Sequence, residues 1–208
     1  VKVTKALTAI RVASRRVPLL LLDGSADLMG LRQVFGDLEV RHVNVRRNAR
    51  IIQVVDRSFS DTALRGDSAR LSDLAGLAKL LRSTNTPGVV ARKSIENLFL
   101  SADIPTLHHG KLRGQNALEQ CDVLLVIGRM QPPPGVMEEQ ARALYPFENL
   151  NLPGCYQRGA ASYRISSNEL QEVQERQWLH PDPRVAARVQ QSRENELAQA
   201  IDRARLGC

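Results

Sequence analysis

The stretch Val123-Leu124-Leu125-Val126-Ile127-Gly128-Arg129 decides the fold class of this chain. Five consecutive branched apolar residues predict a strand that is buried on both faces, which is typical of a parallel sheet. The glycine and the arginine that follow predict a turn at the end of this strand. This is the clearest strand signal in the sequence, and the other elements are interpreted around it.

Helical patterns separate this strand from the other candidate strands. Apolar stripes and breaker residues predict helices over 6–16, 28–35, 73–81, 94–100, 136–144 and 183–205. Short apolar or alternating runs predict strands over 19–22, 40–45, 51–55, 89–91, 106–108 and 123–127, with another at 172–176. Residues 58–73 are expected to form a loop, and residues 149–163 an irregular or hairpin region. This alternation predicts an α/β protein with a parallel sheet.

The composition is that of a globular protein, and its basic balance favours a phosphate-bearing partner, although an Arg bias can also be purely compositional. The 208 residues are 43% hydrophobic and 25% charged, with only 4% aromatic residues and a net charge of +7. Five of the 29 basic residues are Lys, which leaves 24 Arg, and this favours nucleotides or nucleic acids. The longest apolar run, residues 17–22, is too short to span a bilayer. Three cysteines without metal-like spacing favour a cytoplasmic location and no membrane partner.

Polar loops follow three of the predicted strands. They are Asp23-Gly24-Ser25-Ala26-Asp27, the segment from His109 to Asn116, and the pair Gly128-Arg129. In an open parallel sheet, ligands bind at the loops that follow the carboxyl ends of the strands. Taken singly, each loop also has an ordinary interpretation as a turn or as exposed surface.

The last predicted helix carries a fourth polar group. Gln199, Asp202 and Arg203 share one face at helical spacing, and Arg205 lies on another side or just beyond the helix end. An amide and two guanidiniums near a helix end can hold a phosphate, although a solvated Arg-rich surface helix explains the same pattern. The buried stripe of this helix is predicted to consist of Leu197, Ala200, Ile201 and Ala204.

The order of these segments resembles the C-terminal part of superfamily 2 helicases, most closely the helicase modules of plasmid, phage and mobile-element replication proteins. Residues 21–27 resemble motif III, whose core is Ser-Ala-Thr, with Asp27 in place of Thr. Residues 87–98 resemble motif IV, residues 109–116 motif V, and residues 123–129 the strand and Gly-Arg pair that follow it. Residues 199–205 resemble motif VI, Gln-x-x-Gly-Arg-x-Arg, with Asp202 in place of Gly.

The resemblance implies a fold, a function and cofactors. The expected fold is a RecA-like second helicase lobe of the P-loop NTPase type over residues 61–208, preceded over residues 1–60 by the end of the first motor lobe and the connection between lobes. The implied function is that of the C-terminal motor lobe of an ATP-dependent nucleic-acid helicase or translocase. ATP and Mg²⁺ would be bound mainly by a first lobe that is missing from this sequence.

The resemblance also implies roles for individual residues. Gln199, Arg203 and Arg205 would reach the γ-phosphate, where arginines stabilise the transferring group. Four residues would couple nucleotide state to the grip on the strand: Asp23, Ser25, Ala26 and Asp27. Six residues would contact single-stranded or duplex nucleic acid, with DNA the favoured substrate: His109, Lys111, Arg113, Gly114, Asn116 and Arg129. No metal ligands are expected within this chain.

The sequence contains neither a Gly-x-x-x-x-Gly-Lys-[Ser/Thr] phosphate loop nor an Asp-Glu-x-[His/Asp] run for magnesium. We therefore expect that the chain is a fragment and that it does not hydrolyse ATP by itself. The alternative function is a non-catalytic, basic α/β module that binds nucleic acid or a partner protein. A nucleotide-binding enzyme of another kind is disfavoured, because no Gly-rich fingerprint follows the first predicted strand.

Several isolated residues keep more than one interpretation. The adjacent pair His108-His109 has no third metal ligand nearby in sequence, and the position of His180 in the proline-rich turn 180–183 favours a structural role. Trp178 and Tyr156 could stack on a base, or could anchor local packing. The basic cluster at 46–50 could meet a phosphate backbone or form a solvated loop.

Overall fold

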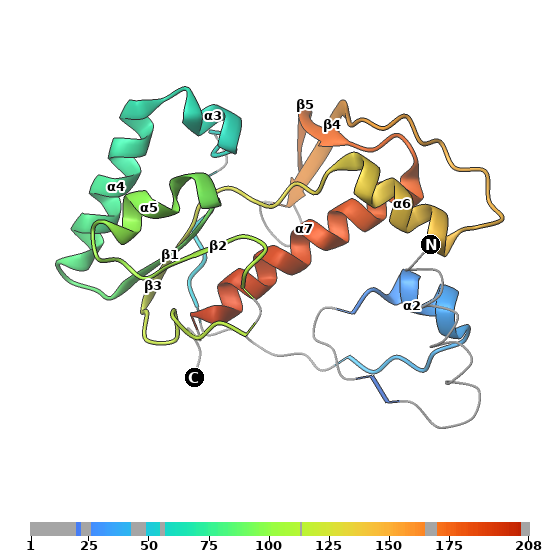
Figure 1. Cartoon of the computed structure of the whole chain (residues 1–208), viewed down its shortest axis with the longest axis horizontal. Coiled ribbons are helices and arrows are strands. Elements are labelled where there is room, and N and C mark those ends of the chain that lie inside the picture. The colour runs from blue at the N-terminus through green and yellow to red at the C-terminus, as the bar shows by residue number, and fades with distance from the viewer. Residues whose placement is uncertain are drawn as a thin grey trace. The chain divides into compact units, whose positions relative to one another are not determined.

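The computed structural model describes residues 20–21, 26–42, 49–54, 57–112, 114–164 and 170–204, and for residues 160–164 and 170–177 the backbone alone. The chain forms two compact units, each made of segments that are distant in sequence. We call them the ribbon unit (residues 1–41 and 132–192) and the sheet unit (residues 42–131 and 193–208). Figure 1 shows the elements of both. The boundary expected between residues 60 and 61 stays a prediction.

The sheet unit is built on three parallel strands. They are β1 Pro87–Ala91, β2 Thr106–His108 and β3 Val123–Val126, in the order β2-β1-β3. The central strand β1 is buried along its whole length. Its residues pair with β2 from Val89 onward and with β3 from Pro87 onward. The prediction of an α/β protein with a parallel sheet is thereby confirmed, as are three of the predicted strands.

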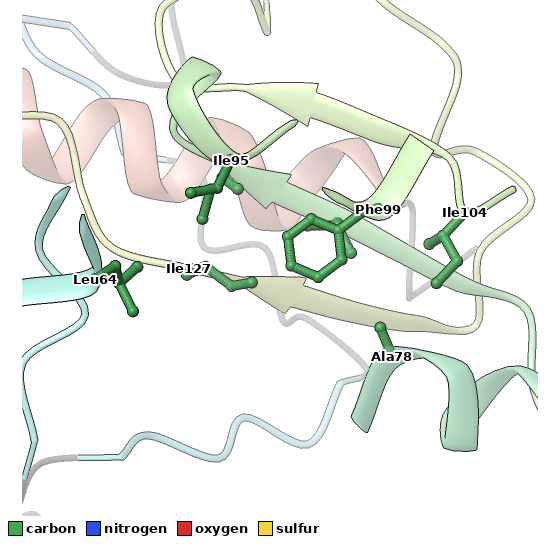
Figure 2. Close-up of a cluster of buried hydrophobic side chains, with 8 residues drawn as sticks. Leu64, Ala78, Ile95, Phe99, Ile104 and Ile127 are labelled. Carbon is green, nitrogen blue, oxygen red and sulfur yellow. The ribbon is translucent and has the colours of Figure 1, made fainter. Parts of the chain in front are cut away.

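Alternate residues of β1 point to opposite sides of the sheet. Both faces are covered by other parts of the chain. On one face lie α3 Asp61–Arg65, α4 Ser68–Arg82, η1 Lys93–Ile95 and α5 Glu96–Leu100. Figure 2 shows their buried side chains around the sheet. This cluster consists of Leu64, Ala78, Val89, Ala91, Ile95, Phe99, Ile104 and Ile127. The other face buries Val90, Leu107, Leu112, Leu118, Cys121 and Ala200.

The last of those residues, Ala200, belongs to the long closing helix α7 Pro183–Arg203. This helix confirms the prediction for residues 183–205 within the described chain. It begins in the ribbon unit, where Val185 and Val189 pack with α6 Pro134–Leu144 through Met137 and Ala141. It ends in the sheet unit.

The ribbon unit also contains one short helix and a two-stranded antiparallel ribbon. Helix α2 spans Leu28–Phe35 and stops at Gly36, whose positive φ of 77° lets its N–H turn back to the Arg32 carbonyl. The ribbon joins β4 Gln157–Arg164 to β5 Leu170–Leu179, with an irregularity between Gly159 and Ala161. The helix prediction for 28–35 and the strand prediction for 172–176 are therefore confirmed. Of residues 149–163, predicted to be irregular or a hairpin, only 157–163 lie in a strand, and their partner strand β5 lies beyond this region.

Three predicted strands are wrong in the part of the chain that the structure describes. Leu20 and Leu21 belong to no strand and are 80% and 45% exposed. Ile51, Ile52 and Val54 are likewise extended, unpaired and exposed, and residues 40–42 form no strand. Apolar runs become strands only where a neighbouring strand accepts their backbone hydrogen bonds, and sequence does not supply that neighbour.

The loop predicted over 58–73 is also wrong, because it contains α3 and the start of α4. Ser60 caps α3 by accepting from Ala63 N, and Asp67 caps α4 by accepting from Arg70 N. These caps offset the low helix preference of the polar segment. The helix predicted at 6–16 and the strand residues 43–45 lie outside the described residues. Within the described ranges, none of the helices combines the length and apolar character needed to cross a membrane.

Candidate functional site

The carboxyl ends of the three parallel strands meet at one edge of the sheet. The chain continues there as Arg92 after β1, His109 after β2 and Ile127-Gly128-Arg129 after β3. In the order β2-β1-β3, the chain that leaves β1 runs to β2 on one side, and β3 lies on the other side of β1. A crevice between neighbouring loops is therefore expected between the carboxyl ends of β1 and β3. That position is where open α/β sheets bind their ligands. We call this region, with the loop 109–116 and the adjoining end of α7, the carboxyl edge.

His109 fastens the ends of all three strands together. Its backbone N–H donates to the Ala91 carbonyl at 3.0 Å, and its Nε2 lies 3.3 Å from the carbonyl oxygen of Ile127. Burial lowers the pKa of the imidazole, with a smaller opposing effect of the Ile127 carbonyl. The neutral ring therefore donates from Nε2, while Nδ1 is buried and has no hydrogen-bond partner among the described residues.

Two arginines lie where β1 and β3 end. The Arg92 guanidinium donates through Nη2 to the Arg129 carbonyl at 3.3 Å, while the Arg129 side chain is exposed. The turn that precedes Arg129 requires a glycine at position 128, because the backbone there has a φ of +71°. In addition, a Cβ atom at this position would lie only 2.7 Å from the Phe59 carbonyl oxygen. Arg92 was missed by the sequence analysis, although a basic residue directly after the short run Val89–Ala91 was the available signal.

The end of α7 docks against the loop that follows β2. Ala200 is fully buried in the core cluster of this sheet face, and the Glu196 carboxylate accepts a hydrogen bond from the Gly110 N–H. Gln199 and Arg203 are partly buried beside this contact on the same helix. The Gln199 Oε1 atom is buried without a hydrogen-bond partner in the described structure. Arg205 lies outside the described residues.

The predicted stripe of this helix is narrower than expected. Ala200 and Ala204 are buried and Ile201 is partly buried, as predicted, but Leu197 is 37% exposed. The buried positions of α7 against the sheet are the small residues Ala200 and Ala204, and Leu197, one turn earlier, lies at the edge of this contact. The contact of Glu196 was missed, because an acidic residue on a helix gives no indication in the sequence of a distant backbone partner.

The loop after β2 presents polar groups to solvent. Lys111, Gly114 and Asn116 are exposed, and Gly114 has a φ of +70°. The Asn116 carbonyl accepts from the Glu119 N–H, which closes the loop into a turn. Arg113 lies outside the described residues. The fold therefore brings this loop, the Gly128-Arg129 turn and the end of α7 into one unit.

Two of the four predicted motif III residues lie among the described residues. Asp23 and Ser25 lie outside the described residues, while Ala26 and Asp27 directly precede α2. Asp27 caps this helix by accepting from Gly30 N at 3.0 Å, and its carboxylate forms an ion pair with Arg188 of α7. With its amide nitrogen facing the carboxylate, Gln191 also donates to Asp27. Asp27 thus holds α2 against α7 within the ribbon unit, and its coupling role stays a prediction.

A second polar cluster lies in the ribbon unit and is buried. His180 contacts Glu138 Oε1 through Nε2 at 3.0 Å and accepts from the Asp182 N–H through Nδ1. Asp182 accepts from the Asn151 N–H at 3.0 Å and from both the backbone and the guanidinium of Arg184. The guanidinium holds the pKa of Asp182 well below its usual range. These contacts tie α6, α7 and the chain between them together, in agreement with the structural interpretation of His180.

Among the described residues, no group of three or more His, Cys, Asp or Glu side chains is arranged to hold a metal ion. No family model, curated protein or solved structure matches this chain.

Proposed function

We propose that this chain is the C-terminal, RecA-like motor lobe of an ATP-dependent helicase or translocase of superfamily 2, acting on nucleic acid through its carboxyl edge. The observation that carries this proposal is the hydrogen bond between Gly110 and Glu196 together with the burial of Ala200. These contacts join the loop that resembles motif V to the helix end that resembles motif VI. The two segments are 86 residues apart in sequence.

The chemistry of the carboxyl edge suits a polyanion. Arg92, Lys111 and Arg129 supply cationic side chains at one edge of a covered parallel sheet. His109 holds together the strand ends next to these side chains. Phosphate-backbone contacts of this kind supply much of the affinity of proteins for nucleic acid and make that affinity dependent on salt.

In the proposed mechanism, ATP and Mg²⁺ bind on a first lobe that carries a phosphate loop. Arg203, with Arg205 and Gln199, would approach the γ-phosphate when the two lobes close and would stabilise negative charge in the transition state. Because the same stretch of α7 is bonded to the loop 109–116, closure on the nucleotide would change the grip on the strand. Opening after hydrolysis would then release that grip.

Nucleic-acid binding by the chain is the first test. Lys111→Ala should weaken binding to a labelled single-stranded DNA by about fivefold and reduce the slope of log affinity against log salt by roughly 0.7. The matched control is Lys79→Ala, another exposed lysine of the sheet unit, in the last turn of α4 near the amino end of β1. Equal effects of the two substitutions in fluorescence anisotropy would contradict a site at the carboxyl edge.

Nucleotide turnover is the second test, made in the longer protein that the proposal requires. There Arg203→Ala should lower DNA-stimulated phosphate release by about a thousandfold and leave DNA binding nearly intact. Arg142→Ala, which removes an exposed arginine of α6, is the matched control. Unchanged turnover in Arg203→Ala, with salt-sensitive DNA binding preserved, would favour the alternative of a non-catalytic basic binding module.

A further inference from the structure

The β4–β5 ribbon presents an aromatic ring and a cation side by side. Arg158 on β4 pairs in register with Trp178 on β5. The Arg158 guanidinium carbon lies 5.4 Å from the centroid of the indole ring, which is within the range of a cation–π contact. Figure 1 shows the ribbon as two adjacent strands of the ribbon unit.

The other face of the ribbon is packed by a different residue. An added Cβ at Gly159 would lie 2.8 Å from Leu179 Cδ1, so Leu179 covers the backbone of the opposite strand at that position. Because neighbouring residues of a strand point to opposite faces, Leu179 and Trp178 lie on different faces of the ribbon. Leu179 therefore packs locally on the ribbon, and Trp178 is left on the other side.

Trp178 does not behave as a packing anchor. It is 52% exposed and belongs to none of the three buried clusters in the described structure. It is also the only tryptophan of a chain in which aromatic residues make up 4%. A large apolar ring that is kept at the surface beside an exposed arginine has the composition of a single-strand binding site, in which bases stack and cations meet phosphates.

We propose that Trp178 and Arg158 form a second nucleic-acid contact, in which the indole stacks on an unpaired base and the guanidinium meets the adjacent phosphate. This inference rests on the proposed function, because it takes nucleic acid as the ligand of the chain. The contact requires an exposed base face, so its ligand is single-stranded nucleic acid. It adds affinity with little dependence on base identity, since every base offers a π-face.

Because the chain contains a single tryptophan, its fluorescence reports on this site alone. Titration of the whole chain with single-stranded oligodeoxynucleotide should quench the indole emission and shield it from acrylamide. An abasic strand of the same length should bind through its phosphates without quenching. The duplex of the same sequence should quench less than the single strand.

Substitutions separate stacking from a structural role of the ring. Trp178→Ala should weaken binding to single-stranded DNA by about tenfold in fluorescence anisotropy, whereas Trp178→Phe should retain most of the affinity. Arg158→Ala should reduce the salt slope by roughly 0.7. The matched control is Phe147→Ala, which removes another aromatic side chain of the same unit that is 99% exposed and should leave binding unchanged.

The outcomes distinguish this inference from the proposed function. Salt-sensitive binding that depends on Lys111, with indole emission unchanged by single strands, would overturn the stacking site and leave the carboxyl edge intact. Equal losses in Trp178→Ala and Phe147→Ala would also overturn it. If the chain binds no nucleic acid at all, both proposals fail.

Discussion

The polar cluster of the ribbon unit and the carboxyl edge of the sheet unit differ in how completely their buried polar atoms are hydrogen-bonded. Glu138, His180 and Asp182 are buried, and each has at least two hydrogen-bond partners. At the carboxyl edge, the buried atoms Arg92 Nε, His109 Nδ1 and Gln199 Oε1 have no hydrogen-bond partner among the described residues. The ribbon unit has two exceptions outside this polar cluster, the buried Tyr145 hydroxyl and the buried Arg188 Nε atom.

This difference separates a structural cluster from a candidate binding site. Buried polar groups that satisfy one another lower the free energy of the folded chain, and they leave few donors for a ligand. Groups without partners reduce stability, unless a ligand or water satisfies them. The contrast predicts that substitutions in the ribbon cluster change stability and that substitutions at the carboxyl edge change binding.

The largest expected effect is that of Asp182→Ala on stability. The substitution removes the cap of α7 and leaves the Arg184 guanidinium and the Asn151 N–H without their buried acceptor. The free energy of unfolding should fall by about 3 kcal/mol, measured by urea denaturation. Glu39→Ala, which removes an exposed ion pair with Arg41, should cost under about 0.5 kcal/mol. A small loss in Asp182→Ala would mean that the cluster is not structural.

Gly128→Ala should have the next largest effect, because it strains the turn at the carboxyl edge. Its positive φ and the approach of the Phe59 carbonyl leave no room for a methyl group. We expect a loss of about 2 kcal/mol in the free energy of unfolding. Gly135→Ala is the control, since nothing lies within 4 Å of an added Cβ in α6, and it should be neutral or slightly stabilising. Equal stability of the two variants would show that the turn adapts.

Arg92→Ala should reverse the pattern of Asp182→Ala. It removes one hydrogen bond to the Arg129 carbonyl, so we expect a stability loss of at most about 1 kcal/mol. Binding to single-stranded DNA should weaken by about fivefold at moderate salt, because one phosphate contact is lost. Anisotropy and urea denaturation on the same samples provide both measurements. A large stability loss with unchanged DNA binding would place Arg92 among the structural residues.

His109→Gln should have the smallest effect, visible mainly as a change in pH dependence. The pKa of His109 lies below its usual value of 6.5 in the folded chain, so the unfolded chain takes up its proton first as the pH falls. The stability contribution of neutral His109 is therefore present above pH 6.5 and is lost as the pH falls below that value. The Gln variant should change stability at neutral pH by under about 1 kcal/mol and flatten this loss. His42→Gln, at an exposed histidine, is the control.

Local patterns in the sequence were sufficient to predict the helix ends and turns that single glycine or proline residues mark. Gly36 and Pro183 mark helix ends by their backbone preferences, so α2 and the start of α7 were predicted correctly. The loop after β2 and the turn at Gly128 were found for the same reason. The caps Ser60 and Asp67 carried a local signal too, but the surrounding polar segment concealed it.

Tertiary structure decided which segments became strands and which polar residues gathered at one edge. Ile51 and Ile52 have the same strand preference as Val89 and Val90, yet only β1 has neighbours on both sides to accept its backbone hydrogen bonds. The contacts of Glu196 with Gly110 and of Arg188 with Asp27 join residues far apart in the chain.

The sequence by itself determined the α/β class, the end of α2, the start of α7 and the loops after β2 and β3, because these depend on residues close together along the chain. The arrangement of these two loops at one edge of the sheet, and the exposure of Trp178, depend on packing between distant segments. Such packing is fixed only when the whole chain buries its apolar surface.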